Sequence, residues 1–185
     1  LLTAERVALN VVQRLSGIAA MAAEYVAKIE GTGAVLLDSR KTTPGLRNLE
    51  KYAIVCGGGR NHRLGLDNGI MLKDNHIAVA GSITAAVKRA KTHAPILTKI
   101  EVECDNLDQV RECLDAGADI IMLDNMSNED MREAVKMSAG RVPLECSGGV
   151  RLDTIRAKAE TGVDYVSVGR ITQSAPCVDI GLDEI

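Results

Sequence analysis

Basic residues are concentrated in one stretch of the sequence. Between Asp38 and His76 seven Lys and Arg stand against four Asp and Glu, a local charge of +3 in a chain whose net charge is -3. A charge run is more often a solvated face than a site, but these residues fall in three polar segments with turn signals: SRKTTPG at 39–45, GGGRNHR at 57–63 and LKDNH at 72–76. Because Arg presents a planar fork and Lys a compact charge to carboxylate or phosphate, the pattern predicts a site for a small substrate with several negative groups. The candidates are Arg40, Lys41, His62, Arg63 and Lys73.

Two acidic residues, Glu103 and Asp124, end successive apolar runs that are typical of strands. If those strands are neighbours, the two carboxylates lie near each other. One or two carboxylates, completed by substrate phosphates and water, are how Mg²⁺ is usually held. The alternative is that each acid pairs with a neighbouring Lys or Arg, and the sequence leaves both interpretations open.

Glycines follow the two last apolar runs, as Ser147-Gly148-Gly149 and as Gly169. Glycine lets backbone N–H groups approach an anion where a helix begins, and barrels often hold a phosphate at their last two strands. A Gly-Gly pair alone is also ordinary turn chemistry. Two such turns at adjacent late strands favour phosphate binding.

The elements that must position these residues alternate along the chain. Residues 3–30 carry apolar side chains at three- and four-residue spacing and predict a long helix with Thr3 as its cap. The predicted strands are 34–37, 70–72, 96–102, 120–123, 142–144 and 163–168, and the predicted helices between them include 82–93, 107–116, 128–139 and 153–161. Strands alternating with helices indicate βα units and a parallel sheet.

Six strands fall short of the eight of a closed (β/α)₈ barrel, so the sheet is an incomplete, open α/β barrel or a doubly wound open sheet. Polar residues at the carboxyl end of each run favour the barrel, where βα loops build active sites. These residues are Lys41, Lys73, Glu103, Asp124, Ser147 and Gly169. Alternation agrees, because Lys99, Glu101 and Glu103 share one strand face, which we expect to line the barrel interior.

Composition bounds the remaining possibilities. The 185 residues are 46% hydrophobic, with no Trp or Phe, which predicts one domain over 1–185 with an aliphatic core. The net charge argues against nucleic acid or anionic membranes as partners. No apolar run approaches the roughly 20 residues of a membrane span and no signal peptide opens the chain, so we expect a cytoplasmic protein. Five cysteines without a CxxC pair predict buried thiols rather than disulfides or a zinc site.

The same segments resemble the signature segments of the quinolinate phosphoribosyltransferase family, the carboxylating nicotinate-nucleotide pyrophosphorylases. The matching stretches, in order, are LDSRKTTPG at 37–45, GGGRNHR at 57–63, KDNH at 73–76, EVE at 101–103, LDN at 123–125, ECSGG at 145–149 and GVDYVSVG at 162–169. The resemblance covers essentially the whole chain. It implies an enzyme of NAD biosynthesis that joins quinolinate to phosphoribosyl pyrophosphate and releases pyrophosphate and CO₂.

The resemblance also implies roles for the residues. Arg40, Lys41, His62, Arg63 and Lys73 would surround the quinolinate carboxylates and the pyrophosphate, with Lys41 and Lys73 among the catalytic groups. Glu103 and Asp124 would face the ribose and its Mg²⁺. The 5-phosphate would lie on Ser147, Gly148, Gly149 and Gly169.

The chain departs from the family pattern in three respects. Ser39 replaces a usual Thr and keeps the hydroxyl, whereas Gln173 stands where the family commonly has His. Family members also carry an N-terminal domain, which resembles a lid and supplies an arginine to the partner's site in a head-to-tail dimer. We expect that domain to be absent from this chain and the longer form to be a homodimer or higher homo-oligomer.

Several alternatives remain open. A nicotinate phosphoribosyltransferase or the paralogue of molybdate transport operons shares the architecture, although the many cations favour a dicarboxylate. Lys73 or Lys99 could be the Schiff-base lysine of an aldolase-type barrel. A non-catalytic barrel fragment that binds an anion or phosphate is a third possibility.

Overall fold

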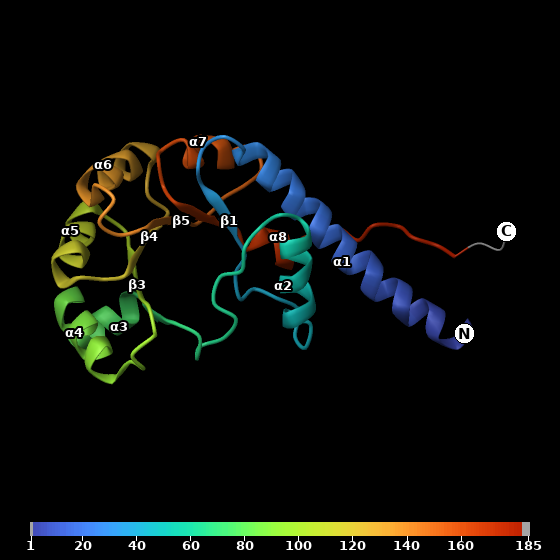
Figure 1. Cartoon of the computed structure of the whole chain (residues 1–185), viewed down its shortest axis with the longest axis horizontal. Helices are drawn as coiled ribbons and strands as arrows, with labels where there is room; N and C mark the ends of the chain where they lie inside the picture. The colour runs from blue at the N-terminus through green and yellow to red at the C-terminus, as the bar shows by residue number, and fades with distance from the viewer. Residues whose placement is uncertain (1, 183–185) are drawn as a thin grey trace.

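The computed structural model describes residues 2–182 and contains one curved parallel sheet with its helices on the outside (Figure 1). Its strands are β1 (Val35–Leu37), β2 (Ile70–Leu72), β3 (Ile100–Cys104), β4 (Ile120–Asp124), β5 (Leu144–Ser147) and β6 (Tyr165–Ser167). The strand order is β1-β6-β5-β4-β3-β2, with every pairing parallel. The predicted open α/β barrel of six parallel strands is therefore confirmed.

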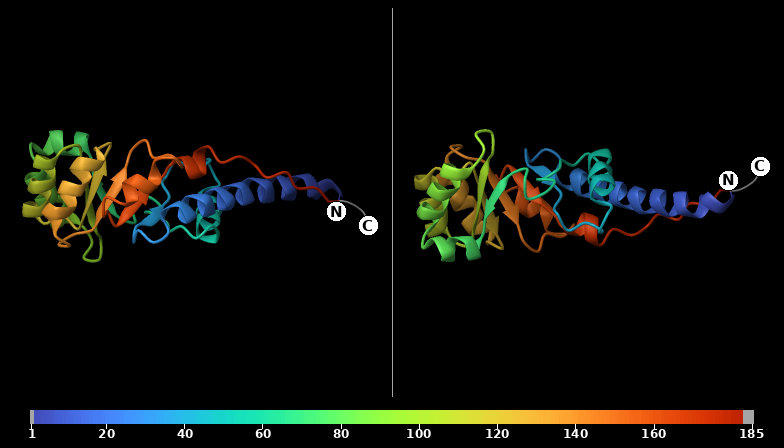
Figure 2. Two further views of the ribbon diagram at one scale, coloured as in Figure 1. Left: turned by 90° about the horizontal axis from the view of Figure 1, so that it is seen from above. Right: turned by 90° about the horizontal axis from the view of Figure 1, so that it is seen from below.

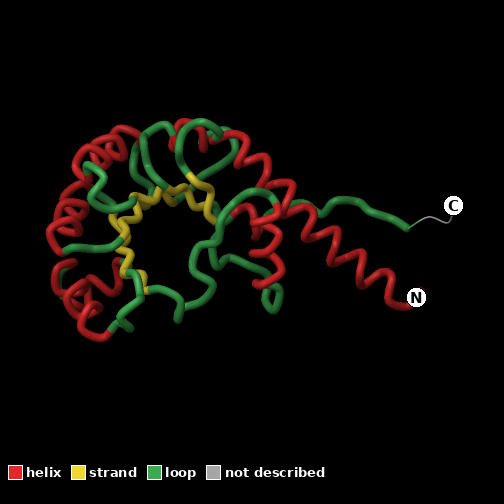
Figure 3. Tube along the Cα trace, in the orientation of Figure 1, coloured by secondary structure: helices red, strands yellow, loops and turns green. Residues whose placement is uncertain are grey.

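The helices are α1 (Leu2–Ile29), α2 (Arg47–Cys56), α3 (Asp74–Ala80), α4 (Ile83–His93), α5 (Leu107–Ala116), α6 (Asn128–Ser138), α7 (Ile155–Ala159) and α8 (Arg170–Gln173). The strands form the inner wall of an incomplete ring and the helices its outer wall (Figure 3). Within residues 2–182, β1 and β2 are the two edges of the sheet and do not pair with each other. The ring is thus open along one seam.

Strand β3 shows how the sequence separates the two faces of the sheet. Ile100, Val102 and Cys104 are fully or almost fully buried in the core under the helices, while Glu101 and Glu103 point the other way, into the barrel. Lys99 precedes the strand, and its side chain is 74% exposed beside Asp119. The predicted charged interior face is confirmed for the two glutamates, whereas Lys99 lies at the rim.

Polar side chains cap the starts of three outer helices. The side chains of Ser82, Asn106 and Ser127 each accept a hydrogen bond from the backbone N–H three residues on, at the starts of α4, α5 and α6. Glycine in the left-handed conformation ends α5 at Gly117 (φ 72°). These caps explain why α4, α5 and α6 lie within a residue of their predicted bounds.

Other boundaries were predicted less well. The apolar run at 96–102 is a strand only from Ile100, because Ile96 and Leu97 are 98% and 93% exposed in the loop before it. Helices α2, α3 and α8 were not predicted. Buried thiols were predicted for all five cysteines, and this is wrong for Cys56 and Cys177, which are exposed.

Helix α1 packs one face on the barrel and projects beyond it. Ile18, Ala22, Tyr25 and Ile29 are buried on that face. The N-terminal half extends away from the barrel with the C-terminal segment beside it (Figure 2), joined by the amide of Gln13, which donates to Ile180 O at 2.9 Å. The helix begins at Leu2, so the prediction that Thr3 caps it is wrong.

No helix within residues 2–182 combines the length and the apolar character needed to span a bilayer.

Candidate active site

All eleven predicted site residues line one cavity at the carboxyl ends of the strands. The cavity has a volume of about 750 Å³. Its wall includes Arg40, Lys41, His62, Arg63, Lys73, Glu103, Asp124, Ser147, Gly148, Gly149 and Gly169. Residues far apart in sequence converge there because the strands are parallel and all carboxyl ends face the same way. Cavities of this size take small ligands.

The loop that carries Arg40 and Lys41 follows β1 and is fixed by helices on both sides. The carboxylate of Glu50 accepts hydrogen bonds from the N–H (3.1 Å) and the hydroxyl (2.7 Å) of Thr43. The hydroxyl of Thr172 donates to the Lys41 carbonyl at 2.7 Å. Since Glu50 lies on α2 and Thr172 on α8, two helices that the sequence did not predict position the first two cations.

A buried ion pair lies directly beneath that loop. Lys51 Nζ is 2.5 Å from Asp38 Oδ1, and both side chains are 2% exposed or less. Asp38 Oδ1 also accepts the His62 N–H at 2.9 Å, and the Asn61 amide, in the orientation that satisfies both neighbours, donates to Asp38 Oδ2 at 2.7 Å. Burial raises the pKa of Asp38 although the bond to Lys51 lowers it, so desolvation outweighs the attraction of the pair.

Arg63 and Arg40 place two guanidinium groups in one wall of the cavity. Burial lowers the pKa of Arg63, and the positive charge of Arg40 lowers it further. The guanidinium group of Arg63 is fixed at one nitrogen, because Nη1 donates to the Gly69 carbonyl at 2.8 Å. Because Arg40 lowers the pKa of Arg63, an anion placed between the two cations stabilises both, which agrees with the anion site that the sequence pattern predicts.

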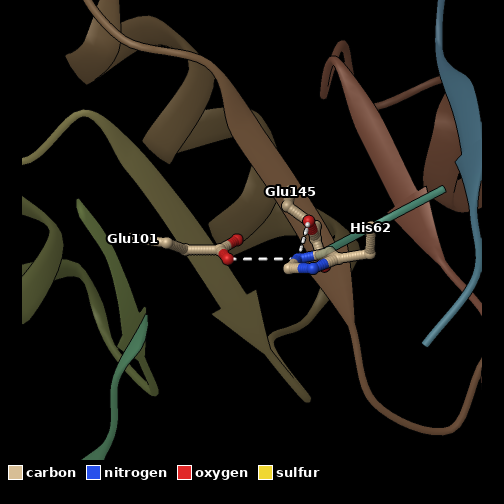
Figure 4. A group of neighbouring side chains, drawn as sticks. All are labelled: His62, Glu101 and Glu145. Atoms are coloured by element: carbon tan, nitrogen blue, oxygen red, sulfur yellow. Dashed lines mark ion pairs between the residues drawn. The ribbon is translucent and has the colours of Figure 1, made fainter. Parts of the chain in front are cut away.

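His62 points into the barrel and meets two glutamates (Figure 4). Its Nε2 is 3.1 Å from Glu101 Oε2 on β3 and 3.3 Å from Glu145 Oε2 on β5. Burial would lower the pKa of His62, but hydrogen bonds to the two carboxylates raise it to about 10. Burial raises the pKa of Glu145, and the charge of Glu101 adds to this effect. The shifts of His62 and Glu145 are linked, because each group is buried against the other, and the proton between them belongs to the pair rather than to one residue.

The hydrogen bonds of this cluster limit what His62 can bind. Because the Arg63 N–H donates to His62 Nδ1 at 2.7 Å, Nδ1 acts as an acceptor in this arrangement, and the protons that the cluster retains lie at Nε2 and the glutamate oxygens that face it. Although a histidine and two glutamates within 4.8 Å are metal-ligating types, a protonated Nε2 cannot ligate a metal in this arrangement. The substrate contact predicted for His62 remains a prediction. His62 lines the cavity, but both of its nitrogens are engaged by the protein.

Glu103 and Asp124 end β3 and β4 and both face the cavity. Glu103 Oε2 forms an ion pair with Lys73, and Asp124 Oδ2 accepts from the Asn125 amide at 2.9 Å. Lys73 paired with a carboxylate is not in the apolar or cation-rich surroundings that a Schiff-base lysine needs, and Lys99 lies exposed at the rim. The aldolase alternative therefore loses both of its candidate lysines.

The turn after β5 brings backbone close to the end of β4. Gly148 (φ 86°) and Gly149 (φ 59°) have left-handed conformations. A Cβ atom on Gly148 would lie 2.2 Å from Asn125 Oδ1 and 2.8 Å from Asn125 N. Glycine is thus required at Gly148 both for its conformation and for the close approach.

Replacement of Gly148 by Ala tests this turn. The left-handed conformation and the clash with Asn125 lower the free energy of unfolding by about 1 to 3 kcal/mol. The affinity for inorganic phosphate falls in the protein that remains folded, since the turn must open to admit the methyl group. Denaturant unfolding and calorimetry measure the two effects. The matched control is Gly140→Ala, also left-handed but with nothing near its Cβ, which loses stability without losing phosphate affinity.

Several cavity residues were not predicted from the sequence. They are Asn125, Glu145, Arg151, Arg170 and Gln173. Arg170 directly follows Gly169 and Arg151 stands two residues after Gly149, so proximity in sequence could have included both. Glu145 carried a signal as well, because it stands two residues before Ser147 and therefore on the same strand face.

The fold and the cavity together define a class. This is an open α/β-barrel domain whose strand ends gather cations, carboxylates and glycine turns around one cavity, an arrangement suited to small substrates with several negative charges.

Residues 18–183 match the family described as quinolinate phosphoribosyl transferase, C-terminal domain, and the chain belongs to this family. It is 49% identical over 183 residues to the probable nicotinate-nucleotide pyrophosphorylase [carboxylating] of Bacillus subtilis, and 42% identical over 187 residues to the nicotinate-nucleotide pyrophosphorylase [carboxylating] of Rattus norvegicus. The matched regions cover 99% and 98% of this chain but only 63% and 62% of those relatives.

Solved structures of the same family have the same fold as this chain. The nicotinate-nucleotide pyrophosphorylase from Ehrlichia chaffeensis superimposes with a TM-score of 0.94 at 46% identity, covering 99% of this chain and 66% of that one. The fold assigned from the sequence pattern is thus that of the family.

Proposed function

We propose that this chain supplies the barrel part of an enzyme that transfers phosphoribosyl from phosphoribosyl pyrophosphate to quinolinate. The products are nicotinate mononucleotide, pyrophosphate and CO₂. The observation that carries the proposal is one cavity whose wall brings together six Lys and Arg side chains, the carboxylates of Glu103 and Asp124, and two glycine turns. Relatives named carboxylating nicotinate-nucleotide pyrophosphorylase support it.

The cations bind and orient the dicarboxylate. Arg40 and Arg63 take one carboxylate between them, and Lys41 and Lys73 supply charge to the second carboxylate and to the leaving pyrophosphate. Held in this way, the pyridine nitrogen faces the ribose carbon, so that an encounter in solution becomes a positioned reaction. Once the nitrogen is ribosylated, the positive ring favours loss of CO₂ from the adjacent carbon, and the electron pair left on that carbon takes a proton from the solvent.

The acids and the glycine turns face the phosphoribosyl group. Glu103 and Asp124 stabilise positive charge that develops on the ribose as pyrophosphate leaves. Ser147, Gly148, Gly149 and Gly169 receive the 5-phosphate in the two turns after β5 and β6.

Glu103 and Asp124 also fit Mg²⁺, because both present carboxylate oxygens, the donor type that this ion prefers, at the cavity wall. Bound there, the ion would neutralise charge on the pyrophosphate. Lys73 would then exchange its contact with Glu103 for one with substrate.

The close alternatives differ in substrate. An enzyme that acts on nicotinate needs to neutralise only one carboxylate. The paralogue of molybdate transport operons shares the same architecture. The repulsion between Arg40 and Arg63 favours the more highly charged ligand. By resemblance to the family, we further propose a cytoplasmic enzyme that acts as a homodimer when the remaining length of the relatives is present, which cell fractionation and gel filtration test.

Quinolinate is expected to raise the melting temperature of this chain more than nicotinate does. The second carboxylate gains a charge-assisted contact worth about 1.5 to 3 kcal/mol, which is a roughly tenfold to hundredfold difference in affinity. Thermal shifts at matched concentrations measure it.

Phthalate, which keeps both carboxylates but lacks the ring nitrogen, is the control ligand. It should bind nearly as well as quinolinate, because binding depends on the carboxylates. Equal shifts with quinolinate and nicotinate would remove the reason for assigning the dicarboxylate.

A further inference from the structure

The open seam of the barrel leaves one side of the cavity without sheet hydrogen bonds. Residues 60–63 run along this seam beside β1. The Arg60 N–H donates to the Leu36 carbonyl at 2.9 Å, and the Asp38 N–H donates to the Arg60 carbonyl at 3.2 Å. The bridge between Leu37 and Arg60 is parallel but isolated, so this segment is not a full strand.

His62 connects this segment to the opposite wall. Its backbone is anchored on the β1 side, where the N–H donates to Asp38 and the carbonyl accepts from Lys51 Nζ at 3.0 Å. Its side chain crosses the barrel interior to Glu101 on β3 and Glu145 on β5 (Figure 4). The carboxylates are 4% and 1% exposed as residues, and their Oε1 atoms have no hydrogen-bond partner. His62 therefore supplies the hydrogen bond that these buried acids share.

We propose that His62, Glu101 and Glu145 form a cross-barrel tie that positions Arg63 for the substrate. The link is direct, because the Arg63 N–H donates to Nδ1 of the same imidazole whose Nε2 faces the glutamates. Fixing the ring thus fixes the backbone from which the guanidinium projects. Histidine suits this place because one flat ring accepts at one nitrogen and donates at the other.

The tie also sets the spacing between the two walls of the cavity. Arg40, Lys41 and Arg63 stand on the β1 side of the seam, whereas Lys73 directly follows β2 and Glu103 lies on β3. Within residues 2–182 no strand pairing joins these walls directly across the seam. A displacement of about 1 Å between groups that hold one small substrate is enough to lose much of the benefit of positioning.

Conservative variants test the tie. Glu145→Gln and His62→Ala are expected to weaken quinolinate binding roughly tenfold in calorimetry, with phosphate binding at the glycine turns unchanged. His62→Gln, whose amide can still donate toward the glutamates, should bind within about threefold of the unaltered chain. Near-ultraviolet circular dichroism establishes that each variant is folded.

A matched control distinguishes a positioning role of the tie from a merely structural one. Ser138→Ala removes another buried hydrogen bond, to the Val142 carbonyl in the loop after α6, and should lower stability without changing quinolinate affinity. If folded Glu145→Gln and His62→Ala bind quinolinate as the unaltered chain does, the tie does not position Arg63 and the inference is wrong.

The quinolinate readout rests on the proposed function, so a second readout does not use it. Hydrogen exchange at the Arg63 amide should be at least about fivefold faster in Glu145→Gln, while the Ile121 amide, bonded to Pro143 within the sheet, stays unchanged. If the unaltered chain fails to bind quinolinate, the proposed function fails, and this exchange rate still decides the tie. Unchanged exchange at Arg63 would overturn it.

Discussion

Lys51→Met is expected to lower the free energy of unfolding by about 3 to 5 kcal/mol, the usual cost of removing one partner from a buried ion pair. The substitution leaves the Asp38 carboxylate buried, with the His62 N–H and the Asn61 amide as its remaining hydrogen-bond donors. Because burial already raises the pKa of Asp38 against the effect of Lys51, the carboxyl without Lys51 must fold protonated or destabilise the native state. Denaturant unfolding at pH 7 measures the loss.

The double variant Asp38→Asn, Lys51→Met separates charge from packing. The asparagine oxygen still accepts the His62 N–H, and no charge remains buried, so more than half of the lost stability should return. Lys136→Met removes an exposed pair with Glu133 on α6 and should change stability within error. If Lys51→Met unfolds like the unaltered chain, then the pair does not support the loop that carries Arg40 and Lys41.

Glu103→Gln is expected to lower kcat by about a hundredfold in a form of the protein that has the full length of its relatives. The carboxylate is assigned to charge that develops on the ribose, so its loss appears in the transition state. Quinolinate affinity should be kept or increased, because Lys73 loses its acidic partner and turns its charge to the substrate. Steady-state kinetics measure kcat, and calorimetry measures the affinity for quinolinate.

Glu112→Gln is the matched control for this charge. Glu112 is an acid on α5 that accepts from Thr84, outside the cavity, and its neutralisation should leave kcat unchanged. A Glu103→Gln enzyme with normal kcat at saturating Mg²⁺ would show that the residue has no role in the chemical step.

Local pattern explains most of the fold. The apolar spacing predicts helices at 3–30, 82–93, 107–116 and 128–139, and their observed bounds differ by a residue or two. Alternation in β3 predicts which face holds Glu101 and Glu103. These features depend on neighbours in the sequence, which is why the sequence alone was enough.

The predictions that were wrong depend on contacts between distant residues. Ile96 and Leu97 look like the start of a strand, but the sheet pairs only from Ile100 onward. The ligand contact of His62 stays a prediction, but its ion pairs with Glu101 and Glu145 were not predicted. They follow from the curvature of the barrel, which brings β3 and β5 within reach of the segment at 60–63. The spacing of residues along the sequence does not show that His62 lies next to these two glutamates.

The most direct test of the proposed function follows both leaving groups of one reaction. With phosphoribosyl pyrophosphate, Mg²⁺ and quinolinate, the form with the full length of the relatives should release pyrophosphate and CO₂ in equal amounts, with nicotinate mononucleotide as the other product. Pyrophosphate released at a comparable rate with nicotinate in place of quinolinate, or none released with quinolinate, would contradict the assignment of the cation-lined cavity to a dicarboxylate.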